Sequence, residues 1–151
     1  MLAQDIMIDQ VYKVKGSDTV RAVIERFIKY RISGLPVVND HNEIIGYVSD
    51  GDIMRYIGKH NDVVIDAMWS SFFIEGDKEN FSERVKHLLK LNVLEIAKRK
   101  VLKVQWDEPI ENIAAILGKK QIKKLPVERD GVLIGIISRG DVIRHAFKSI
   151  L

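Results

Sequence analysis

The sequence predicts a mixed α/β protein of the α+β type: two pseudo-symmetric β-α-β-β-α units packed through their sheets, with a helical segment between them. The main observation is an internal repeat. Residues 32–37 (ISGLPV) recur at 122–127 (IKKLPV), and residues 45–52 (IGYVSDGD) recur at 134–141 (IGIISRGD). The offset is 90 residues for the first pair and 89 for the second, so one residue is missing from a surface turn. Two such units imply a paired body with a cleft between its halves.

Hydrophobic spacing places a helix early in each unit. Apolar residues recur at i, i+3, i+4, i+7 and i+8 over 20–28, and a matching pattern covers 110–117. Residues 17–18 and 107–108 are candidate N-caps, and Pro109 suits a first helical turn.

Short strands and a closing helix complete each unit. Leading strands are expected at 11–14 and 101–104, a hairpin at 35–38 and 44–49 across 39–43, a turn at 129–131, and last helices starting near Asp52 and Asp141.

The segment between the repeats has no counterpart elsewhere in the chain. It contains an apolar cluster at Met68, Trp69 and residues 72–74, and then an amphipathic stretch at 83–91. A structureless linker of this length is unusual in a compact domain, so we expect one or two helices. The predicted organisation is a first unit at 1–57, a connecting helical segment at 58–92, and a second unit at 93–151.

Composition limits the class of protein. The chain has 151 residues, no cysteine and a net charge of +3. Its apolar runs are too short to span a membrane, and its start lacks the pattern of a secretion signal. We therefore expect a cytoplasmic protein without disulfides, not bound to a membrane, and without the clustered charge of a nucleic-acid-binding surface.

A Leu-Pro-Val strand followed by Gly-x-x-Ser-x-x-Asp occurs twice, at 35–37 with 46–52 and at 125–127 with 135–141. This pattern resembles the cystathionine-β-synthase (CBS) domain, and a pair of such units resembles a Bateman module. The resemblance covers about two thirds of the chain. It implies a non-enzymatic regulatory sensor that binds AMP, ADP, ATP or S-adenosylmethionine as a ligand, and it implies assembly into a homodimer.

The chemistry of the repeated motif fits such a ligand. An aspartate at a strand-to-helix junction accepts both hydroxyls of a ribose, and the first N–H groups of a helix attract phosphate. Backbone beside Pro36 and Pro126, where sheet pairing is interrupted, is available to an adenine edge. By the resemblance, the residues that line the clefts are Ser33, Gly34, Leu35, Pro36, Ser49, Asp52, Lys123, Lys124, Leu125, Pro126, Ser138, Arg139, Asp141 and Arg144.

The same Ser-x-x-Asp pattern has a simpler explanation. It is a capping box, which satisfies helix N–H groups without any ligand. Capping and binding are compatible, because a serine caps while the aspartate faces a cleft.

The two predicted clefts differ in charge. The second unit has Lys123, Lys124 and Arg139 where the first has Ser33, Gly34 and Asp50, so the sequence favours the second cleft for a phosphate. Two alternatives stay open at this point: these cations form a solvated face, or they crowd the cleft.

Other chemistry finds little support in the sequence. The four histidines, at 41, 60, 87 and 145, lack metal-ligand spacing, and neither a Walker phosphate loop nor a catalytic constellation is visible. Two hypotheses follow: a nucleotide sensor, or an interaction scaffold with empty clefts that binds an unknown protein partner. For the dimer, we expect an interface made by the last helices together with Trp69, Phe72 and Phe73, although these aromatic residues also suit a core or a wall for a base.

Overall fold

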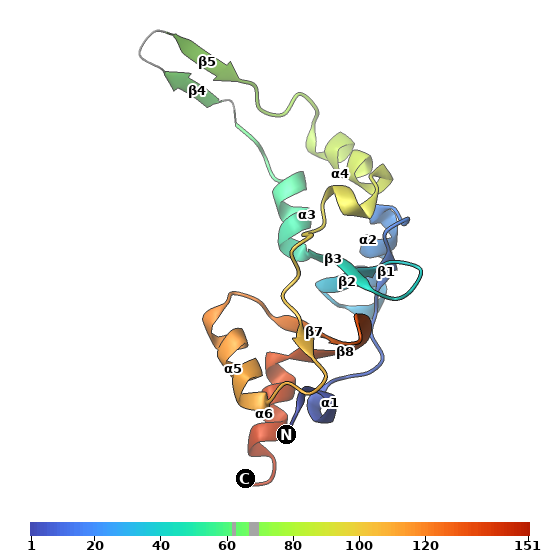
Figure 1. Cartoon of the computed structure of the whole chain (residues 1–151). Helices are drawn as coiled ribbons and strands as arrows, with labels where there is room; N and C mark the ends of the chain where they lie inside the picture. The colour runs from blue at the N-terminus through green and yellow to red at the C-terminus, as the bar shows by residue number, and fades with distance from the viewer. Residues whose placement is uncertain (62, 67–69) are drawn as a thin grey trace.

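The computed structural model describes residues 1–61, 63–66 and 70–151 and contains two similar units (Figure 1). The first repeat forms α1 (Ala3–Ile6), β1 (Val14–Lys15), α2 (Val20–Tyr30), β2 (Gly34–Val38), β3 (Ile44–Ser49) and α3 (Asp50–Ile57). The second forms the 3₁₀-helix η1 (Val93–Glu95), β6 (Val104–Gln105), α5 (Ile110–Lys119), β7 (Lys124–Arg129), β8 (Val132–Ser138) and α6 (Arg139–Phe147). The predicted mixed fold with two three-stranded sheets is confirmed.

Each sheet has the same topology. In the first unit, β1 pairs in parallel with β2, and β2 pairs antiparallel with β3. Strands β6, β7 and β8 repeat this arrangement, and both sheets carry an irregularity at the equivalent point of the hairpin. The turn predicted at 129–131 is present, with Asp130 (φ 51°) and Gly131 (φ 81°) in the left-handed region that such a hairpin turn requires.

Two details of the prediction were wrong. The leading strands are only two residues long and begin at Val14 and Val104, later than expected. The helix caps are also displaced, because Thr19 and Pro109 occupy the N-cap positions of α2 and α5. Asp18 instead accepts a hydrogen bond from the Lys15 N–H (2.8 Å) in the preceding turn.

Each unit has its own hydrophobic core, and the two cores exchange the segments that open the repeats. Val93 of η1 and Leu88 lie in the first core, against strands β2 and β3 and helix α2. Ala3 and Ile6 of α1 lie in the second core, with Ile113 and other residues of the second repeat. The start of each sequence repeat therefore packs into the other structural unit.

The units meet along their sheets. The Leu133 N–H donates to the Asn42 carbonyl (2.9 Å), and the Asn42 amide donates to the Leu133 carbonyl (2.9 Å). Two further backbone pairs, Tyr47 with Lys98 and Ile8 with Ile136, are equivalent under the pseudo-symmetry. The Tyr47–Lys98 and Ile8–Ile136 pairs attach each exchanged segment to the edge strand of the unit into which it packs.

The segment between the repeats is only partly helical. Helix α4 (Phe81–Lys90) agrees with the amphipathic stretch predicted there, but the residues before it form a β-hairpin of β4 (Val63–Asp66) and β5 (Ser71–Ile74), which corrects the all-helical prediction. The predicted apolar residues Met68 and Trp69 lie outside the described residues. Figure 1 shows the hairpin extending away from both units, at the end opposite the two termini.

The base of this hairpin is held by polar contacts. His60 donates its backbone N–H to Asp77 Oδ2 (2.6 Å), and its Nδ1 lies 2.8 Å from Asp77 Oδ1. The buried Arg84 of α4 donates to the Ile57 carbonyl (3.0 Å) and lies 3.2 Å from Asp77. These contacts join the end of α3, the base of the hairpin and α4.

A fragment of residues 1–57 should not fold as a monomer. It lacks Leu88 and Val93, both nearly fully buried in the first core, and a unit of this size alone buries little surface. We expect broad, poorly dispersed amide NMR spectra or self-association. A well-dispersed spectrum from a monomeric fragment would contradict the exchanged packing.

The stability of the contact between His60 and Asp77 at the base of the hairpin should depend on pH. The side-chain hydrogen bond to Asp77, with the Arg55 carbonyl and the Asp77 charge, raises the pKa of His60 above its ordinary 6.5. The stabilisation is therefore complete below pH 6.5 and is lost as the pH rises through the raised pKa of His60. The NMR titration midpoint of the His60 ring should lie above 6.5 and fall in Asp77→Asn. A midpoint at or below 6.5 in the wild-type protein would show that the pair does not form.

Candidate functional site

The strand-to-helix junction of the first unit holds a buried carboxylate. Asp52 Oδ2 accepts hydrogen bonds from the Ser49 N–H (2.9 Å) and the Ser49 hydroxyl (3.2 Å). Asp52 Oδ1 accepts from the Arg55 guanidinium. Only 5% of the Asp52 side chain is exposed, whereas 64% of the Arg55 side chain is. Both oxygens of Asp52 are thus engaged by the chain itself.

The second junction repeats this arrangement. Asp141 Oδ2 accepts from the Ser138 N–H and hydroxyl (both 2.8 Å), and Asp141 Oδ1 accepts from Arg144 (2.5 Å). The Asp141 N–H donates to Ser138 Oγ (3.2 Å), which completes a capping box at the start of α6. The capping explanation of the motif is therefore correct in both units, and the buried carboxylate of each unit also has an arginine partner.

A cavity of about 530 Å³ lies between the units beside the first junction. Its lining comes from β2, β3 and the start of α3 on one side, and from the segment before β6 and the start of β7 on the other. The lining residues are Ser33, Gly34, Tyr47, Ser49, Asp50, Gly51, Arg55, Lys98, Lys100, Val101, Leu102, Gln121, Ile122, Lys123, Lys124 and Pro126.

This cavity is strongly positive. Among the described residues, its lining has five cationic side chains and one carboxylate, an excess of four positive charges. The carboxylate, Asp50, faces Lys123 of the other unit with 3.9 Å between Nζ and Oδ2. Cations from both units therefore surround the space into which the first junction opens.

Tyr47 shapes the cavity next to Gly34. A Cβ added at Gly34 would lie 2.6 Å from the Tyr47 hydroxyl, so glycine is what allows the ring to sit there. Burial, and secondarily the charge of Asp50, raise the pKa of Tyr47 to about 12. Tyr47 therefore stays neutral and offers a ring and a hydroxyl donor to a ligand. The second unit has Ile136 at the equivalent position.

The structure separates the predicted site residues into two groups. The cavity lining includes Ser33, Gly34, Ser49, Lys123, Lys124 and Pro126. It does not include Leu35, Pro36, Asp52, Leu125, Ser138, Arg139, Asp141 and Arg144. Leu35 and Leu125 are completely buried in the two cores, so their side chains serve packing.

Several lining residues were not predicted as site residues. Lys98 and Lys100 lie in a short basic run at residues 98–100, a pattern that usually forms part of a solvated surface. They reach the cavity because the Lys98 backbone pairs with Tyr47, through hydrogen bonds of 2.9 and 3.0 Å. No local pattern signals this long-range pairing.

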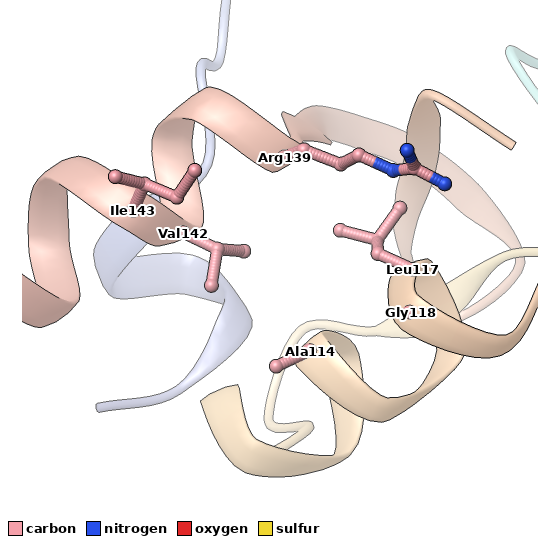
Figure 2. A pocket seen from close by; sticks show the side chains of 6 residues that line it. All are labelled: Ala114, Leu117, Gly118, Arg139, Val142 and Ile143. Atoms are coloured by element: carbon pink, nitrogen blue, oxygen red, sulfur yellow. The ribbon is translucent and has the colours of Figure 1, made fainter.

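Two smaller hollows flank the helices. One, of about 310 Å³, is an apolar groove between α5 and α6, where Figure 2 shows Ala114 and Val142 on opposite sides. Arg139 borders this groove and donates to the Lys120 carbonyl (3.2 Å) near the end of α5. The other, of about 280 Å³, is lined by Asp52, Arg55, Tyr56, His60 and Ile96.

Neither a metal site nor a membrane span is found in the described part of the chain. Across residues 1–61, 63–66 and 70–151, no cluster of three or more histidine or carboxylate side chains is placed to hold a metal ion. Within the same ranges, none of the helices has the length and apolar character needed to cross a membrane.

A duplicated βαββα unit with a capped Ser-x-x-Asp junction, and a cavity between the copies, defines a class of paired two-unit modules. The chain belongs to the CBS-domain family: the family model of the CBS domain matches residues 3–59 and 93–148. It is 35% identical over 151 residues to the uncharacterized protein MJ1426 of Methanocaldococcus jannaschii, covering 95% of this chain and 89% of that protein. It is 31% identical over 146 residues to the chloroplastic CBSX1 of Arabidopsis thaliana, covering 93% of this chain and 61% of that protein.

Solved structures of CBS-domain pairs share the fold. The crystal structure of CBSX2 in complex with AMP has a TM-score of 0.73 and 26% identity, covering 98% of this chain and 97% of that chain. The CBS domain pair of MJ0100, in complex with 5′-methylthioadenosine and S-adenosyl-L-methionine, has a TM-score of 0.67 and 20% identity, covering 99% and 98%. Structures with this fold thus contain AMP in one case and adenosine-derived sulfur compounds in the other.

Proposed function

We propose that this chain is a non-enzymatic regulatory module that binds an adenosine-containing ligand in the cleft between its units. The observation that carries the proposal is the cavity of about 530 Å³, which is of the size of small-molecule sites and is lined by motif residues of both repeats. The AMP complex of CBSX2 supports the ligand class. The absence of cysteine supports a reducing compartment such as the cytoplasm.

The charge of the cavity favours a nucleotide over S-adenosylmethionine. An excess of four positive charges around the space stabilises phosphate, whereas a sulfonium cation gains nothing from it. The apolar part of the lining, including Tyr47, Val101 and Ile122, suits the faces of an adenine ring. ATP and ADP balance this charge better than AMP does.

This assignment places the proposed site at the first junction. The sequence favoured the second because of Lys123 and Lys124, yet both lysines line the cavity at the first. The junction at Ser138 and Asp141 stays a predicted second site.

We expect Lys98→Glu with Lys100→Glu to weaken ATP binding strongly, because the pair of substitutions cancels the positive excess of the cavity. A thermal-shift panel with ATP, ADP, AMP and S-adenosylmethionine measures this. At a ligand concentration of 100 Kd, the wild-type protein should gain about 2.7 kcal/mol. Lys86→Glu, on the exposed side of α4, is the matched control and should behave as wild type. Equal stabilisation of both variants by ATP would exclude this cavity as the site.

A homodimer is the assembly that we propose. Met54 of α3 and Ile143 and Phe147 of α6 are at least half exposed, and such apolar patches mark interaction surfaces. Tyr56, which lies on the same helix as Met54 and belongs to the predicted interface, is half-buried against the first core. The predicted contribution of Trp69 lies outside the described residues.

Ile143→Asp with Phe147→Asp should convert the dimer to a monomer, because each introduces an unpaired charge into the proposed apolar interface. Light scattering at micromolar concentration measures the mass. A mass of 17.3 kDa for the unmodified chain, that of one copy, would contradict the dimer.

The alternative is an interaction scaffold that binds a protein through the hairpin. Val64 and Phe73 face each other across the strands and are 61% and 59% exposed, and a two-stranded hairpin alone is marginally stable. A chain that no nucleotide stabilises, but that loses a partner when the hairpin is replaced by a short glycine-serine linker, would favour this function.

A further inference from the structure

We propose that Arg55 is a latch that closes the site in the absence of ligand and makes it select phosphorylated adenosine over adenosine itself. This inference rests on the proposed function. It concerns the guanidinium of Arg55, which in the structure donates a hydrogen bond to Asp52, the carboxylate that a ribose would need.

The first argument is the hydrogen-bond capacity of Asp52. Its Oδ2 already accepts two hydrogen bonds from Ser49, and its Oδ1 accepts from Arg55. The side chain is almost entirely buried, so there is little room for further donors. Ribose hydroxyls must therefore compete with Arg55 for Oδ1.

The second argument is the position of Arg55 between two hollows. Arg55 lines both the large cavity and the smaller hollow of about 280 Å³, while Asp52 lines only the smaller one. The arginine side chain therefore separates the cavity from the aspartate. A ligand in the cavity reaches Asp52 only after Arg55 has moved.

The third argument is the close approach of Arg55 to Gly51. A Cβ added at Gly51 would lie 3.3 Å from Arg55 Nη1, so the guanidinium lies against the first turn of α3. The second unit repeats the set, since a Cβ added at Gly140 would lie 3.2 Å from Arg144 Nη1. The same three residue types at the same spacing build both latches.

These contacts explain a preference for phosphate. Adenosine breaks the Arg55–Asp52 pair and brings no anion of its own to the released guanidinium. A phosphate accepts the released guanidinium, so one charge-assisted pair replaces another. Arg55 thus acts as a specificity-determining residue, opposing uncharged ligands and tolerating anionic ones.

The test is isothermal titration of adenosine, AMP and ATP into wild-type protein and Arg55→Ala, with Arg144→Ala as the matched control outside this cavity. In Arg55→Ala, adenosine should bind about ten-fold more tightly, while AMP and ATP should bind equally or more weakly. The ratio of AMP to adenosine affinity then falls at least ten-fold. Arg144→Ala should leave that ratio at this cavity unchanged.

A second variant tests the same contact independently, so that the test does not depend on correct folding of Arg55→Ala. Gly51→Ala keeps the arginine and crowds its guanidinium, which must give by a few tenths of an ångström, so it should shift the ratio in the same direction by a smaller amount; Gly140→Ala is its control. An unchanged ratio in both Arg55→Ala and Gly51→Ala, with nucleotides still bound, would overturn the latch alone. Absence of binding of all three ligands to every protein would instead overturn the proposed function, and the latch with it.

Discussion

The hydrogen bonds of a buried aspartate at each strand-to-helix junction are the constraint on which the site depends. Asp52 and Asp141 hold the first turn of α3 and α6 against the end of the preceding strand. A buried carboxylate is tolerated because the serine and the arginine satisfy its oxygens. In the proposed function, the same contacts that cap the helices compete with a ribose for these carboxylates.

Because the opening segments are exchanged, residues of both repeats line one cavity. The segment that follows η1 runs along the edge of the first sheet, where the Lys98 backbone pairs with Tyr47. That pairing carries Lys98 and Lys100 into the cavity of the unit to which they do not belong in sequence. The positive field at the first junction is thus a product of tertiary packing, and neither repeat alone contains it.

The sequence predicted the repeated sheets and the capped junctions because their signals are local. Leu-Pro-Val, the hairpin turns and Ser-x-x-Asp each act over a few residues. The exchanged packing of Val93 and Ala3 could not be predicted, since it depends on which of two similar cores receives each segment. The β4–β5 hairpin was missed because short apolar runs such as 71–74 do not distinguish strand from helix. The sequence favoured the second cleft, whereas the proposed site lies at the first junction. The reason is again tertiary packing, which places Lys123 and Lys124 of the second repeat in the cavity beside the first junction.

An amide NMR titration of the full chain with ATP tests most directly the claim that the first inter-unit cleft binds a nucleotide. The account predicts that the largest shift changes occur at 33–34, 98, 100–102 and 121–124, which are parts of the cavity lining contributed by both units. Changes confined to α6 around Gly140, changes confined to the hairpin, or no changes at saturating ATP would contradict it.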